Sequence, residues 1–138
     1  MIRVITGPPG AGKTTYVRDN AQPGDYVIDM DYLADAMWFS NTDELHDYPD
    51  DLRIIARQAR RAAVNAGIEV AQLQFGVNLW IIDTAPGDFM RQKYKAANAK
   101  LIELDPGKEE CLRRLKERDQ KTYPRLRLVV NEWYQTRR

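Results

Sequence analysis

The feature that most constrains this chain is a loop near its N-terminus that is rich in glycine and proline. Residues 7–14 have the sequence GPPGAGKT, with an apolar β-type run at 3–6 before it and a stretch of helical character at 13–20 after it. Glycines let the backbone turn so that consecutive N–H groups point inward at an anion. The helix that follows adds its positive N-terminal end. The sequence therefore predicts a strand–loop–helix unit that binds an anion.

This loop matches the Walker A pattern G-x-x-x-x-G-K-[ST] at every position. In that motif the lysine, here Lys13, reaches the β- and γ-phosphates, and the hydroxyl of Thr14 ligates Mg²⁺. We therefore predict that the chain binds ATP with Mg²⁺. The predicted nucleotide-binding residues all lie in or directly after the loop: Gly7, Pro8, Pro9, Gly10, Ala11, Gly12, Lys13, Thr14 and Thr15. The alternative, a connector that matches by chance, is disfavoured by the flanking strand and helix.

Short apolar runs alternate with longer helical stretches along the rest of the chain. Further strands are expected at 26–29, 78–83 and 100–104, and helices at 32–39, 51–67, 88–98 and 108–118. Gly67 stands where a helix C-cap would be. The last segment fits both a strand and a helix, and we favour a helix. The alternation predicts one domain over 1–138, an α/β/α three-layer fold with a parallel sheet of four to five strands and functional residues at the strand ends.

Composition excludes several classes of protein. The single cysteine, Cys111, leaves no disulfide framework and no cysteine zinc site, so we expect a cytoplasmic protein. The apolar run at 77–82 is too short to cross a membrane, and the N-terminus lacks the pattern of a secretory signal. The net charge is +1, so non-specific binding of nucleic acid through bulk charge is not expected, although residues 108–138 hold ten basic against five acidic residues.

The third predicted strand ends in a pattern that is typical of Walker B. Four apolar residues at 79–82 precede Asp83, which would hold Mg²⁺ directly or through water; the alternative is an aspartate that only ends a strand. Thr84 follows, where many ATPase motors carry a glutamate. The Asn-Lys-x-Asp motif of GTPases is absent, and an AAA-type motor needs a larger module with a helical lid domain. These features favour phosphate transfer to an acceptor over transfer to water.

Together the loop, the short chain and the downstream features resemble the P-loop kinases. More narrowly, they are similar to the small phage and bacterial kinases that include polynucleotide kinases and nucleoside or nucleotide kinases. The resemblance covers residues 1–31 and, less closely, 79–119. It implies an aspartate after the second strand that accepts the proton of an acceptor hydroxyl: Asp31 matches best and Asp29 next, and the other could bind Mg²⁺ through water. The alternative is that Asp31 only caps the next helix.

An arginine-bearing lid at about 108–125 is also implied by the resemblance. Arg114 and Arg118 are four residues apart and share a helix face, so we predict that they lie over ATP as catalytic residues, with Arg113 as a substitute. Arginine binds phosphate bidentately and offsets charge on the transferred group. Such lids usually move to exclude water. The alternative is a solvated charged helix.

The sequence indicates less clearly which residues would bind the phosphoryl acceptor. Four arginines of the long helix are expected on the face opposite its small apolar residues, where they would grip an acceptor phosphate or be solvated: Arg53, Arg57, Arg60 and Arg61. Three aromatic residues could stack on an acceptor base: Tyr32, Trp38 and Phe39. His46 has no evident partner.

The predicted function is therefore transfer of the γ-phosphoryl group of ATP–Mg²⁺ to a hydroxyl of a nucleoside, nucleotide or nucleic acid. Two alternatives stay open. One is a small-metabolite or antibiotic kinase with the same machinery. The other is a nucleotide-gated ATP-binding module that hydrolyses ATP slowly.

Overall fold

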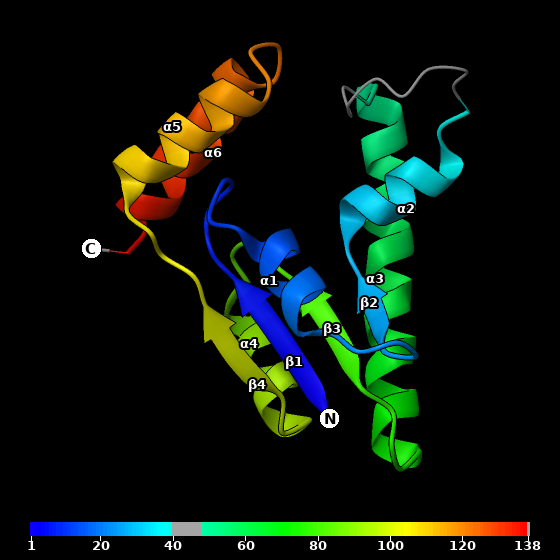
Figure 1. The fold of residues 1–138 in the computed structure, drawn as a ribbon. Coiled ribbons are helices and arrows are strands. Elements are labelled where there is room, and N and C mark those ends of the chain that lie inside the picture. The colour runs from blue at the N-terminus through cyan, green and yellow to red at the C-terminus, as the bar shows by residue number, and fades with distance from the viewer. Residues whose placement is uncertain (40–47, 138) are drawn as a thin grey trace.

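The computed structural model describes residues 1–39 and 48–137, so His46 lies outside the described residues. Four parallel strands form one sheet in the order β2-β3-β1-β4 (Figure 1). The strands are β1 (Ile2–Thr6), β2 (Tyr26–Ile28), β3 (Leu79–Ile82) and β4 (Lys100–Glu103). The helices are α1 (Lys13–Asn20), α2 (Met30–Met37), α3 (Asp50–Leu73), α4 (Asp88–Ala96), α5 (Lys108–Arg118) and α6 (Tyr123–Gln135). Within 1–39 and 48–137, none of these helices combines the length and apolar character that crossing a membrane requires.

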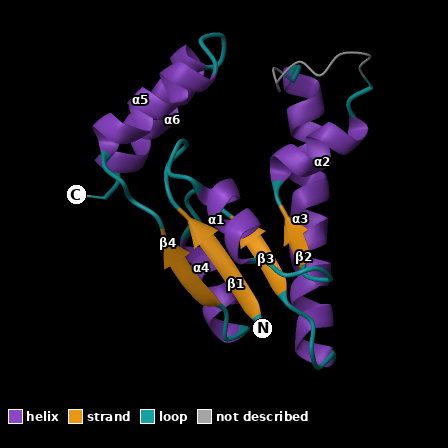
Figure 2. Cartoon of the chain, in the orientation of Figure 1, coloured by secondary structure: helices purple, strands orange, loops and turns teal. Residues whose placement is uncertain are grey.

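Helices cover both faces of the sheet, because alternate residues of β1 point to opposite sides. Val4 packs with Val64 of α3 and Tyr94 of α4 in one core cluster. Ile5 packs with Val17 of α1 in another cluster on the other face. Figure 2 shows the sheet between these layers. The predicted α/β/α fold with a four-stranded parallel sheet is confirmed.

The α5–α6 pair packs against the glycine-rich loop, beyond the carboxyl end of β4 (Figure 1). Its core joins Cys111 and Leu115 of α5, Val130 of α6 and Ala11 of the loop. The predicted C-terminal helix is confirmed as α6. The indole Nε1 of Trp133 in α6 donates a hydrogen bond of 3.0 Å to the carbonyl oxygen of Thr84, in the segment directly after β3. The pair is therefore attached both to the loop and to the sheet.

Two sequence expectations about helix ends are wrong. The long helix does not end at Gly67 but continues to Leu73. A Cβ at Gly67 would lie 3.0 Å from Cδ2 of Leu79 and 3.2 Å from Cδ1 of Ile28, so the glycine lets α3 approach the sheet closely. The second helix begins at Met30, with Asp29 at its N-cap position, so Asp31 is not the cap of this helix.

Candidate functional site

The glycine-rich loop is shaped by close backbone contacts that leave no room for side chains. A Cβ on Gly7 would lie 2.4 Å from the carbonyl oxygen of Leu104, and a Cβ on Gly10 would lie 2.8 Å from that of Cys111. Both glycines have positive φ angles, +145° and +81°. Because side chains avoid such angles, glycine is needed both for the turn and for the close approach of the loop to Leu104 and to α5. Gly12, also at positive φ, occupies the N-cap position of α1.

Lys13 lies inside this loop. Its Nζ donates hydrogen bonds of 2.7 Å and 2.9 Å to the carbonyl oxygens of Gly7 and Pro8, and only 9% of the residue is exposed. Burial lowers the pKa of Lys13 to about 8, although the negative charges of Asp29 and Asp31 act in the opposite direction. The loop thus holds a buried cation beside the N-terminus of α1, where an anion is stabilised.

The two aspartates that the sequence left as alternatives differ in environment. Asp29 follows β2 and is 7% exposed, whereas Asp31 in the first turn of α2 is exposed. Burial raises the pKa of Asp29 to about 6, the charge of Asp31 adds to this rise, and the charges of Lys13 and Arg60 oppose it. Asp29 is therefore the carboxylate whose proton affinity is tuned toward neutral pH.

Asp83 follows β3 and is held by two side chains. Its Oδ2 accepts a hydrogen bond of 2.8 Å from the hydroxyl of Tyr94, and Nη2 of Arg60 lies 3.4 Å from the same oxygen. The same Nη2 donates a hydrogen bond of 2.9 Å to the carbonyl oxygen of Ile82. The sequence did not predict either contact, because neither Tyr94 nor Arg60 is part of a motif with Asp83.

The residues predicted to hold Mg²⁺ have suitable chemistry. Thr14 offers a hydroxyl and Asp83 a carboxylate, and both are the hard oxygen donors that Mg²⁺ prefers. Among the residues that the structure describes, no three His, Cys, Asp or Glu side chains gather as a metal cluster. This donor set fits Mg²⁺, which is usually bound by one or two protein oxygens together with phosphates and water.

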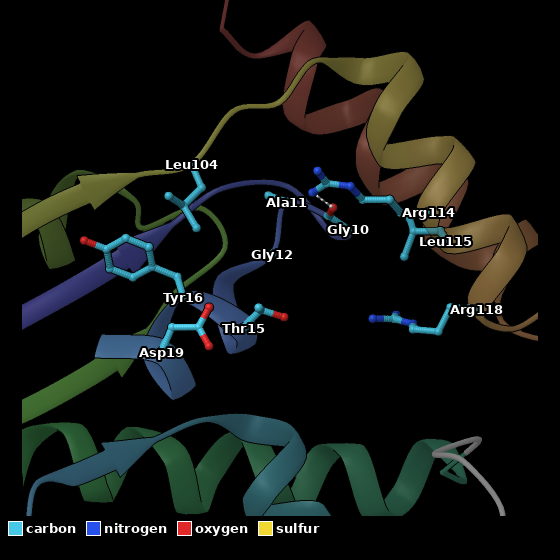
Figure 3. A pocket seen from close by; sticks show the side chains of 10 residues that line it. All are labelled: Gly10, Ala11, Gly12, Thr15, Tyr16, Asp19, Leu104, Arg114, Leu115 and Arg118. Atoms are coloured by element: carbon cyan, nitrogen blue, oxygen red, sulfur yellow. Dashed lines mark hydrogen bonds between the residues drawn. The ribbon is translucent and has the colours of Figure 1, made fainter. Parts of the chain in front are cut away.

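A cavity of about 550 Å³ opens between the loop, α1 and α5 (Figure 3). Its volume is suited to a small-molecule ligand. The residues that line it come from the loop, α1, the segment after β4 and α5: Gly10, Ala11, Gly12, Thr15, Tyr16, Asp19, Leu104, Arg114, Leu115 and Arg118. Tyr16 and Asp19 were not predicted, although Tyr16 lies four residues after Gly12 and Asp19 four residues after Thr15, a spacing that could have identified them.

The two predicted lid arginines both line this cavity. Nη1 of Arg114 donates a hydrogen bond of 3.2 Å to the carbonyl oxygen of Gly10. Figure 3 shows Arg118 extending from α5 toward the side of the cavity that carries Thr15. Arg113, the predicted substitute, does not line the cavity; it pairs with Glu110 and Glu117 on the exposed side of α5. Arg114 and Arg118 thus line the cavity, and Lys13 lies in the adjacent loop.

The four arginines of α3 do not share one face, so that expectation is wrong. Arg53 is buried and lies 3.5 Å from Asp50, and Arg60 turns toward the sheet. Arg57 and Arg61 are exposed. The three aromatic residues predicted to stack on a base are exposed as well: Tyr32, Trp38 and Phe39. Among them, Trp38 also makes an edge-to-face contact with Tyr48.

Comparison with known families fits this geometry. A family model described as an AAA domain matches residues 4–132, and the chain belongs to this family of P-loop NTPases, which includes many kinases. A search of curated proteins found no match to the chain. The match to the family model supports nucleotide binding by this P-loop protein. The narrower resemblance to phage and bacterial kinases, and the expectation that the chain is not an AAA-type motor, stay predictions.

Proposed function

We propose that this P-loop protein is an ATP-dependent phosphotransferase, which moves the γ-phosphoryl group of ATP to an acceptor hydroxyl. One observation carries the proposal: the carboxylate of Asp29, which follows β2, and the ammonium of Lys13, in the loop after β1, are both buried at the carboxyl ends of parallel strands. A proton acceptor and a phosphate-binding cation would thus share one edge of the sheet. Phosphoryl transfer needs mainly positioning and charge neutralisation, which these groups supply.

The nucleotide side of the reaction would use the loop and α5. The backbone N–H groups of Gly10 and Gly12 and the ammonium of Lys13 would bind the β- and γ-phosphates, since Pro8 and Pro9 have no N–H to donate. Arg114 and Arg118 line the adjacent cavity and would offset the charge of the transferred group. The rest of the nucleotide would occupy the cavity beside Tyr16. Mg²⁺, when bound, would neutralise phosphate charge, with Thr14 and Asp83 as its protein donors.

The proton acceptor is Asp29 or Asp31. The resemblance to the small kinases favours Asp31, which matches their aspartate after the second strand. The burial of Asp29 and its pKa of about 6 favour Asp29, because a general base works best when its pKa lies near the working pH. We therefore propose Asp29 as the base and Asp31 as the residue whose charge raises its pKa.

The acceptor proposed is a nucleoside, a nucleotide or a nucleic acid end. Exposed aromatic side chains on α2 and directly after it, Tyr32, Trp38 and Phe39, offer surfaces on which a base could stack. They follow Asp31 along the chain. We also propose that the protein works in the cytoplasm, where ATP is available and Cys111 stays reduced.

The proposal is tested by incubating the protein with γ-labelled ATP and an acceptor panel of nucleosides, nucleotides, 5′-hydroxyl oligonucleotides and small hydroxylated metabolites. One acceptor class should become labelled. Asp29→Asn should abolish labelling while ATP affinity, measured by titration calorimetry, changes little. Asp51→Asn, at an exposed aspartate of α3, is the matched control and should label normally.

Two outcomes would contradict this assignment. Full labelling by Asp29→Asn with loss in Asp31→Asn would move the base to Asp31. Slow release of labelled phosphate with every acceptor left unlabelled would contradict transfer and favour a nucleotide-gated module.

A further inference from the structure

The carboxylate of Asp83 is bound on one oxygen only. Tyr94 and Arg60 both contact Oδ2, at 2.8 Å and 3.4 Å. Oδ1 accepts no hydrogen bond from any residue within 1–39 and 48–137. A carboxylate fixed in this way keeps one oxygen available for another ligand, and metal-binding carboxylates are commonly held by such outer partners.

Tyr94 is a neutral partner of Asp83. It is completely buried, in the core cluster that joins α3 and α4 to the sheet, so its hydroxyl has a fixed position. Its hydroxyl is the donor in the hydrogen bond to Oδ2, so the phenol is an uncharged partner of the carboxylate. Its hydrogen bond orients the carboxylate without cancelling the negative charge.

Arg60 is a charged partner of the same oxygen. Its guanidinium is also fixed by the carbonyl of Ile82, and the side chains of Arg60 and Asp83 are only 21% and 14% exposed. At this burial the interaction between charges is screened less than at the surface. A cation that approaches Asp83 therefore meets a positive charge that already neutralises the carboxylate.

We infer that Tyr94 and Arg60 set the metal affinity of Asp83 in opposite directions, Tyr94 as a positioning residue and Arg60 as a competing cation. The inference rests on the proposed function, because it takes Asp83 as a donor to the metal, directly or through water. Its consequence is that the metal binds weakly until triphosphate charge outweighs that of Arg60. Nucleotide and metal then bind cooperatively.

The test is a titration of the full chain with Mn²⁺, which stands in for Mg²⁺ and is followed by electron paramagnetic resonance, with and without β,γ-imido-ATP. Tyr94→Phe should weaken Mn²⁺ binding in the presence of the nucleotide about tenfold, the loss typical of an outer-shell partner. Arg60→Gln should tighten Mn²⁺ binding in the absence of nucleotide about fivefold, because it removes a charge close to the carboxylate. A variant whose fold is damaged in general would instead bind Mn²⁺ more weakly both with and without the nucleotide.

Matched variants make the result specific. Arg60→Lys keeps the charge and should bind Mn²⁺ like the wild type. Arg57→Gln removes an exposed arginine of α3 and should also leave Mn²⁺ binding unchanged. If Tyr94→Phe does not fold, the tightening by Arg60→Gln and its rescue by Arg60→Lys still decide the inference.

Failure of the inference differs from failure of the proposed function. If Asp83→Asn leaves Mn²⁺ binding with nucleotide unchanged, the metal role of Asp83 is wrong. If Asp83→Asn weakens binding but Tyr94→Phe stays within about twofold of the wild type, or Arg60→Gln weakens binding, the inference is overturned while the metal role stands.

Discussion

The glycine-rich loop and the α2–α3 region meet the same edge of the sheet but are built differently. The loop takes its shape from backbone: Gly7 and Gly10 have positive φ angles, and a Cβ on either would collide with a backbone carbonyl oxygen. The α2–α3 region contributes side chains, such as Arg60, which reaches a carboxylate 23 positions later in the sequence. A site made of backbone depends on a few residue types at fixed spacing, whereas a site made of side chains depends on tertiary packing.

The largest effect that would test this contrast is expected from Lys13→Met. The variant loses the buried ammonium in the loop, and we expect it to cost about 4 kcal/mol of ATP binding, roughly a thousandfold in affinity. Its free energy of unfolding should not fall, because burial already disfavours the ammonium, as the lowered pKa of Lys13 indicates. Titration calorimetry and urea unfolding measure the two effects. Lys116→Met, on the exposed side of α5, is the control and should bind ATP normally.

The same glycine-to-alanine change should have very different effects in the two regions. Gly10→Ala places a Cβ 2.8 Å from a backbone carbonyl at a φ of +81°, and we expect it to destabilise the protein by about 3 kcal/mol. Gly67→Ala lies in a helix, where alanine is favoured, and meets only the ends of flexible Leu79 and Ile28 side chains at 3.0 Å and 3.2 Å. We expect a change below about 1 kcal/mol. Equal losses in urea unfolding would contradict the contrast.

Much of the fold and the loop could be predicted from the sequence, since they depend on local patterns. The alternation of apolar runs and helical stretches is visible in sequence, as is the full motif at 7–14. The expectation for Gly67 was wrong, because a glycine that would signal a helix end lies instead where α3 packs closely on the sheet. Local pattern does not distinguish a cap from a contact made by tertiary structure.

Which candidate site residues lie together could be predicted where one helix carries them. Arg114 and Arg118 share a face by helical spacing, and both line the cavity. The contacts of Asp83 with Tyr94 and Arg60 join three separate elements, and the burial of Asp29 depends on how α2 leaves β2. No periodicity carries such information, so the relative roles of Asp29 and Asp31 could not be assigned from sequence.

The pH dependence of kcat/KM should depend on one residue from each region, Lys13 in the glycine-rich loop and Asp29 at the start of α2. Asp29 with a pKa of about 6 must be deprotonated to accept a proton, so kcat/KM should fall about tenfold per unit below pH 6. Lys13 with a pKa of about 8 must be protonated to bind phosphate, so kcat/KM should also fall above pH 8. A pH–rate profile over 4.5–9.5 measures both limbs.

The variant Asp31→Asn distinguishes the roles of Asp29 and Asp31 in the pH–rate profile. Because the charge of Asp31 raises the pKa of Asp29, Asp31→Asn should move the acid limb to lower pH and keep the reaction. An acid limb that stays in place while the rate collapses would instead make Asp31 the base.

The smallest effect should distinguish two adjacent arginines of α5. Arg114 is 43% exposed and also pairs with Glu110, but it lines the cavity and contacts Gly10, so Arg114→Ala should weaken ATP binding by about 1 kcal/mol, roughly fivefold. Arg113 is paired with Glu110 and Glu117 on the exposed face, and such surface pairs contribute little. Arg113→Ala should therefore leave ATP affinity within about twofold of the wild type. If calorimetry finds the two variants equal, the charge of α5 acts only through its general field, and the α5 face toward the loop has no specific contact with the nucleotide.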